Sequence, residues 1–153
     1  MPGSVVCCVD PSAEAHDAVR VARGLAAALG LELVLLNVEP LPIQPGVSAA
    51  PLGQERLVES EREDADALLE GIVRETGLDP GAVRRRVEFG GAAERILAVC
   101  ADEGAELVVL GSRGRRGLRA TLLGSVSREV AGKAHCIVVL VPPGAAEQTS
   151  LSR

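Results

Sequence analysis

The amino-acid sequence predicts an α/β protein built as one parallel sheet with helices on both faces, similar to a Rossmann fold. Short apolar runs at residues 4–9, 31–38, 106–110 and 136–141 are nearly continuous rather than alternating, which is typical of strands covered on both faces. Patterns of helical period fill the gaps between these runs. The length of 153 residues, of which 47% are hydrophobic, suits a single domain with one core.

The helices are predicted from apolar stripes and from residues that favour helix ends. Ser12 is a good N-cap for a first helix, whose stripe of Ala, Val and Leu side chains ends before Gly30. Further helices are expected at 54–76, 92–103 and 123–133, each between two predicted strands. Strands and helices that alternate in this way indicate a parallel α/β sheet.

A fifth strand is predicted at residues 83–89, and its pattern differs from that of the other four. Val83, Val87 and Phe89 fall on one face, and charged side chains alternate with them. Arg85 interrupts the apolar face. A strand that is polar on one side belongs at the edge of a sheet.

Two segments are predicted to be irregular. Residues 39–53 contain four prolines and form either a plain surface loop or a flap over a ligand. Residues 143–153 are small and polar, which indicates a flexible C-terminal tail after a domain that spans residues 1–142.

Composition excludes several classes of protein. The net charge of −5 opposes nonspecific contact with nucleic-acid phosphates, and Phe89 is the only aromatic residue on which a base could stack. No apolar run is long enough to cross a membrane, and residues 1–9 lack the features of a secretory signal, so a cytoplasmic protein is expected. The four cysteines have no CxxC spacing, which argues against structural zinc and favours a reducing compartment.

The segment after the fourth strand carries the clearest chemical pattern. It runs from Gly111 to Ser127, is rich in glycine and arginine, and leads into a predicted helix. Glycines let backbone N–H groups approach an anion, and the helix adds free N–H groups and the positive end of its dipole. The arginines add positive charge, although a solvated basic face explains them equally well. The segment therefore predicts a phosphate site that is neither a Walker loop nor a dinucleotide fingerprint.

The spacing Gly111-x2-Gly114-x9-Gly124-Ser125 resembles the nucleotide-binding signature of the universal stress protein family. The residues around it, and Val9-Asp10-Pro11-Ser12 after the first strand, are also similar to that family. The resemblance extends over nearly the whole chain, and one departure is Ile137, where many members have proline. It implies a five-stranded sheet of order 3-2-1-4-5, whose strand order reverses between the first and fourth strands. Open α/β sheets bind ligands at such a point.

The resemblance also implies a bound ligand, ATP with Mg²⁺, and the residues that contact it. Asp10 would bond the ribose or the adenine, and Val38 would offer backbone groups to the adenine edge. The phosphates would be held, mainly through backbone N–H groups, by Gly111, Gly114, Gly124 and Ser125. Apolar walls would come from Pro11, Leu110 and Val126. The rest of the predicted site consists of Val9, Ser12, Ser112, Arg113 and Ser127.

Other interpretations stay open at single positions. Asp10 could instead enter the first helix as its N-cap, and Ser125 could cap the last helix in addition to binding phosphate. His16 and His135 are expected to be surface residues.

Several kinds of function are compatible with this site. One is a regulatory module that binds ATP and acts in the stress response. Another is a slow ATPase or an autophosphorylating enzyme with Ser125 or Ser127 as acceptor, but no obvious general base lies near the phosphate loop, which favours the module. A third is a dimeric partner-binding protein with an empty nucleotide site. A homodimer through residues 136–141 is expected, because this apolar strand ends the sheet and carries no lysine or glutamate.

Overall fold

In the computed structural model, which describes residues 2–12, 14–42, 51–112 and 123–148, five strands form a single sheet. The strands are β1 (Ser4–Cys8), β2 (Glu32–Glu39), β3 (Val83–Phe89), β4 (Ala105–Gly111) and β5 (Ile137–Val141). They pair in the order β3-β2-β1-β4-β5, and all four pairings are parallel. The predicted fold class and strand order are confirmed, including the place of the polar strand at one edge.

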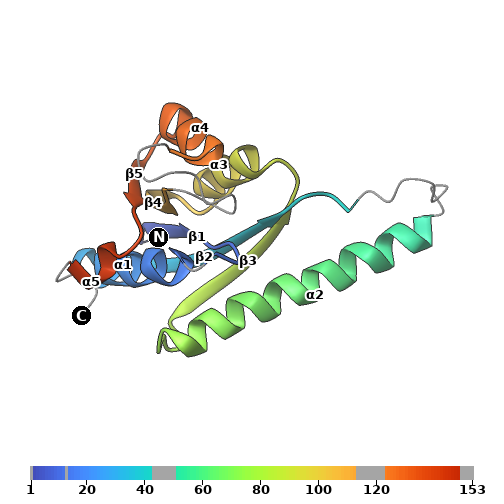
Figure 1. Cartoon of the computed structure of the whole chain (residues 1–153), viewed down its shortest axis with the longest axis horizontal. Helices are drawn as coiled ribbons and strands as arrows, with labels where there is room; N and C mark the ends of the chain where they lie inside the picture. Colours follow the sequence, from blue (N-terminus) through green and yellow to red (C-terminus); the bar gives the residue numbers. More distant parts are fainter. Residues whose placement is uncertain (1, 13, 43–50, 113–122, 149–153) are drawn as a thin grey trace.

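Helices connect the strands and cover both faces of the sheet (Figure 1). They are α1 (Glu14–Leu29), α2 (Pro51–Glu75), α3 (Ala92–Asp102), α4 (Ser125–Lys133) and α5 (Ala145–Gln148). The helices α1, α2 and α5 lie on one face, and α3 and α4 lie on the other. None of the helices in the described ranges is long and apolar enough to cross a membrane.

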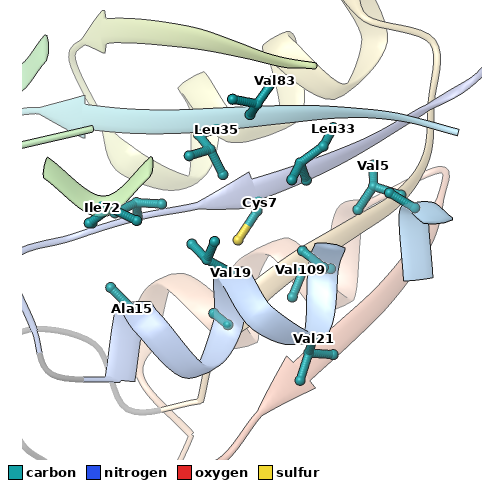
Figure 2. Packing of buried hydrophobic residues seen from close by; sticks show 14 of the residues in the cluster. Val5, Cys7, Ala15, Val19, Val21, Leu33, Leu35, Ile72, Val83 and Val109 are labelled. Carbon is teal, nitrogen blue, oxygen red and sulfur yellow. The ribbon is translucent and has the colours of Figure 1, made fainter. Parts of the chain in front are cut away.

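The side chains of each central strand divide between two cores. Val5 and Cys7 of β1 point toward α1 and pack with residues such as Val19 (Figure 2). Val6, the residue between them, belongs to the core under α3 and α4. Because both faces of β1 are covered, every position from Val5 to Cys7 is fully buried, which explains the continuous apolar run in the sequence.

Helix α2 begins at Pro51, three residues before the predicted start at residue 54. Proline is tolerated at the start of a helix because the N–H that it lacks has no partner within the helix there. From residue 53 onward, the first buried side chain of α2 is Ala65, and in Figure 1 the first half of the helix extends beyond the sheet. Of the proline-rich segment, residues 43–50 lie outside the described residues.

The predicted C-terminal tail contains the short helix α5, which packs against α1. Its Ala146 is only 2% exposed, and the Gly144 N–H just before the helix donates to Asp17 Oδ2 at 2.9 Å. Part of the segment that was predicted to be a flexible tail therefore packs against the core on the α1 side of the sheet. Residues 149–153 lie outside the described residues.

Candidate functional site

The carboxyl ends of β1 and β4 lie next to each other, since Cys7 of β1 pairs with Val109 of β4. From this point the chain continues on one side to Asp10 and on the other to Gly111. The strand order reverses here, because β2 and β4 lie on opposite sides of β1. A crevice at such a reversal is the usual ligand position in an open parallel sheet.

The turn between β1 and α1 is held by hydrogen bonds on both sides of Asp10. The Val9 N–H donates to the Leu36 carbonyl at 2.8 Å, and the Val9 carbonyl accepts a hydrogen bond from Asn37 Nδ2 at 2.9 Å. Asp10 Oδ1 accepts hydrogen bonds from the Ser12 N–H, at 2.9 Å, and from the Ser12 hydroxyl. Asp10 is thus fixed by an Asx turn, and its Oδ2 has no hydrogen bond to any described residue.

The junction between β4 and α4 leaves the N-terminus of the helix open. Gly124 occupies the N-cap with extended backbone angles, and no side chain caps the helix. The Gly124 N–H donates to the Ser112 carbonyl at 2.9 Å, which fixes the entry to the helix beside the end of β4. Ser125 and Val126, the first helical residues, are both exposed. A helix terminus of this kind can bind an anion through its N–H groups and its dipole.

Ser127 differs from the other predicted phosphate contacts. It is 4% exposed, and its hydroxyl donates to the Gly111 carbonyl at 2.9 Å. The hydroxyl therefore joins the end of β4 to the first turn of α4. This bond positions the junction, and it leaves Ser127 with little surface for contact with a ligand.

A hollow of about 240 Å³ lies between the β1–α1 turn and α2. The turn and the start of α1 contribute Asp10, Pro11, Ser12 and His16 to its lining. The α2 side is lined by Ala67, Leu68, Gly71, Ile72 and Glu75. Two of these α2 residues are small, and they leave room beside the carboxylate of Asp10.

The predicted site residues separate into a crevice group and a core group. Those with at least partial exposure at the strand ends or helix starts are Asp10, Pro11, Ser12, Val38, Gly111, Ser112, Ser125 and Val126. Gly124 lies among them, although it is buried itself. Val9 and Leu110 are each 3% exposed and belong to the two cores, so the apolar wall expected from Leu110 is not at the surface. Leu110 continues the alternation of β4 toward the α3 and α4 side. Arg113 and Gly114 lie outside the described residues.

Two polar features near the crevice were not foreseen from the sequence. Asn37 is 1% exposed, and its Oδ1 has no hydrogen-bond partner in the described part of the chain. An asparagine inside a buried apolar strand is the signal that could have revealed it. His16, which was expected simply at the surface, contacts Glu75 Oε2 through Nε2 at 2.5 Å and joins α1 to α2 at the rim of the hollow.

The described residues include no cluster of side chains that could bind a metal ion without help from a ligand. Within the ranges given above, no group of three or more His, Cys, Asp or Glu side chains is arranged to hold a metal ion.

Comparison with known proteins identifies relatives over almost the whole chain. The model of the universal stress protein family matches residues 1–142. A universal stress protein of Thermus aquaticus is 33% identical over 144 residues, which cover 90% of this chain and 97% of the relative.

Solved structures of the same family share the fold. UspA of Lactobacillus plantarum superposes with a TM-score of 0.74 at 19% identity, covering 92% of this chain and 99% of that protein. A universal stress protein of Archaeoglobus fulgidus in complex with dAMP matches with a TM-score of 0.59 at 23% identity, over 90% of this chain and 96% of that one. A further solved structure, of a universal stress protein in complex with cAMP, matches with a TM-score of 0.59 at 21% identity. The match covers 92% of this chain and 96% of that one.

Proposed function

Because the chain belongs to the universal stress protein family, we propose that it binds ATP and acts as a nucleotide-dependent regulatory module in the stress response. The observation that carries this proposal is the open N-terminus of α4 beside Gly111, at the reversal of strand order. Gly111 of the glycine signature and the turn that holds Asp10 both follow strands that end at this reversal. The two complexes of related folds with dAMP and cAMP support an adenine nucleotide as the ligand class.

The proposed ligand lies across the strand ends with its phosphates at the β4 side. Gly111, Gly124 and Ser125 would bind the phosphates, together with Ser112 and with Arg113 and Gly114 of the adjoining loop. Val126 would contribute an apolar contact. Mg²⁺ would arrive on the phosphate oxygens, since this ion commonly binds through substrate phosphates with few protein ligands.

The adenosine end is proposed to lie at the β1 side. Asp10 Oδ2 would accept a hydrogen bond from the ribose or the adenine, and Pro11 would contact the ring system. Val38, at the end of β2, would offer its backbone to the adenine edge. The hollow of about 240 Å³ beside Asp10 is smaller than the ~300–1,000 Å³ of a typical pocket for a whole ligand, so it suits one end of a nucleotide.

Calorimetric titration with ATP tests this proposal. We expect a dissociation constant on the order of micromolar, about −8 kcal/mol, and weaker binding of GTP. Gly124→Asp should abolish binding, because its carboxylate would occupy the phosphate position and repel the ligand. Gly132→Asp is the matched control: it adds the same charge at the exposed other end of α4, where an added Cβ meets no atom within 4 Å. Unchanged affinity in Gly124→Asp, or equal loss in both variants, would contradict the site.

Ser125 allows the enzymatic alternative to be separated from the module. Its side chain is exposed at the helix start, whereas the Ser127 hydroxyl is already bonded to Gly111. Of the two serines, Ser125 is therefore the better candidate to accept a phosphoryl group. ATP turnover or phosphate incorporation that is present in the wild type and lost in Ser125→Ala would favour the enzyme. Equal, negligible turnover in both proteins would favour the module.

We further propose a homodimer through residues 136–141 and a cytoplasmic location. The proposed interface has support in β5, which is the last strand of the sheet and has Ile137 64% exposed. The location is supported by four free cysteines, which persist best in a reducing compartment.

A further inference from the structure

The last residues of β2 direct their backbone groups to two different neighbours. The Leu36 carbonyl accepts a hydrogen bond from the Val9 N–H at 2.8 Å, so it faces β1. The Glu39 carbonyl accepts one from the Gly90 N–H at 2.9 Å, so it faces the β3 side. Because successive residues of a strand point their N–H and C=O groups to opposite sides, Val38 has the orientation of Leu36. Both backbone groups of Val38 therefore face the turn that follows β1.

A regular parallel ladder would use both of these groups. In such a ladder, each bonded residue joins the two neighbours of the residue opposite to it. The Val9 N–H already bonds Leu36, so the Val9 carbonyl is the expected acceptor for the Val38 N–H. The next donor toward the Val38 carbonyl would be the N–H of residue 11, which is proline and has none. Neither group of Val38 has a backbone hydrogen bond to the described turn residues 9–12.

Asn37 occupies the acceptor that Val38 would otherwise use. Its Nδ2 donates to the Val9 carbonyl at 2.9 Å, and the residue is 1% exposed. A carbonyl can only accept, so this bond fixes which way the amide points. The amide oxygen Oδ1 is left buried without a partner among the described residues, and this lowers stability. An apolar residue would avoid that loss, so the amide at this position indicates a role beyond packing.

We propose that Asn37 is a positioning residue for base recognition, because it occupies the Val9 carbonyl and so keeps the backbone of Val38 free to bind an adenine edge. This inference rests on the proposed binding of ATP. Adenine presents a donor, its N6 amino group, beside an acceptor, N1. The carbonyl and N–H of Val38 are an acceptor beside a donor and complement that edge. Hypoxanthine and guanine present O6 and N1–H, the reverse order, and would leave polar groups unpaired.

The side chain of Asn37 acts through its neighbours and does not touch the ligand. It is buried and is not among the residues that line the hollow beside Asp10, whereas Val38 is partly exposed. Asn37→Leu removes the amide donor at similar size. The Val38 N–H then has the Val9 carbonyl as its partner, and the β1–β2 ladder gains one hydrogen bond. Adenine loses a donor, and the phosphate contacts at α4 stay as they are.

Calorimetric titration with ATP and with inosine triphosphate (ITP) measures this role, because ITP carries hypoxanthine and differs from ATP only at the edge concerned. We expect the wild type to bind ATP roughly tenfold more tightly than ITP, and Asn37→Leu to bind the two within about twofold of each other. The affinity for ITP should stay the same, since ITP makes no use of the free Val38 groups. An ATP-to-ITP ratio in Asn37→Leu equal to that of the wild type would overturn the proposal.

Ser4→Ala is the matched control for loss of a buried hydrogen bond. Ser4 is fully buried at the start of β1, the opposite end of the strand, and its hydroxyl donates to the Glu103 carbonyl at 3.0 Å. The variant removes a bond of the same kind, from a side chain to a backbone carbonyl, and should keep the wild-type ratio of ATP to ITP affinity. An equal fall of the ratio in both variants would show general loosening of the sheet and would overturn the positioning role.

Amide hydrogen exchange of the ligand-free protein, followed by NMR, tests the structural step by itself. In the wild type the Val38 N–H should exchange at least ~tenfold faster than the Leu36 N–H, which lies inside the ladder. It should become protected in Asn37→Leu, and in the wild type on addition of ATP. A Val38 N–H that is already protected in the free wild type would overturn this inference even where ATP binds. No binding of ATP would overturn the proposed function and this role together. The wild-type exchange measurement decides the structural step even if Asn37→Leu fails to fold.

Discussion

The two outer strands of the sheet carry opposite kinds of side chain. On β3, Arg84, Arg85 and Arg86 all form ion pairs with carboxylates, either on β3 itself or on segments packed against it. Glu103, which is itself only 10% exposed, bonds Arg84 at 2.7 Å and Arg86 at 3.0 Å. On β5 every residue from 137 to 141 is apolar, and Ile137 is 64% exposed. One edge of the sheet is therefore charged and internally neutralised, whereas the other is apolar.

The contrast between the two edges indicates which edge of the sheet is open to pairing with a second copy of the chain. Charged side chains at an edge discourage pairing with another chain, because a partner strand would have to desolvate them. The β5 edge has no such barrier among its five residues, and a second copy related by a two-fold axis would present the same apolar surface. The proposed dimer follows from the contrast between the edges as much as from β5 alone.

The largest expected effect comes from a charge on the apolar edge. Ile137→Lys should weaken the proposed dimer by roughly tenfold or more, about 1.4 kcal/mol, with little cost to the fold because the side chain is exposed. Val139→Lys should weaken it too, but Val139 also packs against the core and its replacement would destabilise the fold. Light scattering at micromolar concentration measures the mass.

Leu29→Lys is the control for this experiment, because Leu29 is 56% exposed at the end of α1 and lies outside residues 136–141. It introduces the same charge on another element and should leave the mass unchanged. A wild type that is monomeric at micromolar concentration would refute the dimer.

A smaller effect is expected from the charged edge. Glu103→Ala should lower the free energy of unfolding by about 1 kcal/mol, because it removes a mostly buried acceptor from two arginines. Asp102→Ala is its neighbour control: this carboxylate is 66% exposed and lies 3.6 Å from Arg86, so we expect no more than ~0.5 kcal/mol. Urea unfolding compares the two. Equal losses would mean that burial of Glu103 does not set its contribution.

The smallest effect is expected at Arg85. Its Nε lies 3.4 Å from Asp66 Oδ1 of α2, and both side chains are about a third to a half exposed. Arg85→Val removes this weak ion pair and adds a β-branched residue that suits a strand, so the two changes should nearly cancel, within about 0.5 kcal/mol. Urea unfolding measures the stability, and light scattering should show the same mass as the wild type. A change in mass would show that Arg85 protects the β3 edge.

Most of the architecture could be predicted from the sequence because burial on both faces leaves a continuous apolar run. The five strands, the edge position of β3 and the helices between strands all follow from such patterns and from the family resemblance. The start of α2 could not be placed, since Pro51 belongs equally well to a loop and to a first helical turn. The helix α5 could not be predicted either, because a segment of only four residues has little helical tendency of its own and is helical where it packs against α1.

The candidate site was predictable as a location and less so in its individual side chains. Glycine spacing and strand ends place Asp10, Gly111 and Gly124 together. Whether a hydroxyl faces outward or joins two elements depends on tertiary contacts, and the Ser127 bond to Gly111 is such a contact.

The central position of β1 has a consequence for synthesis of the chain. Val6 pairs with Val34 on one side but with Val108 on the other, so one side of β1 has no partner strand until about a hundred more residues have been made. At about 5–20 residues per second, this delay is on the order of 5–20 s. During that interval β1 and β2 expose apolar surface that the finished protein buries under α3 and β4. The nascent chain therefore passes through a stage in which the strand that ends up fully buried is still exposed on one side.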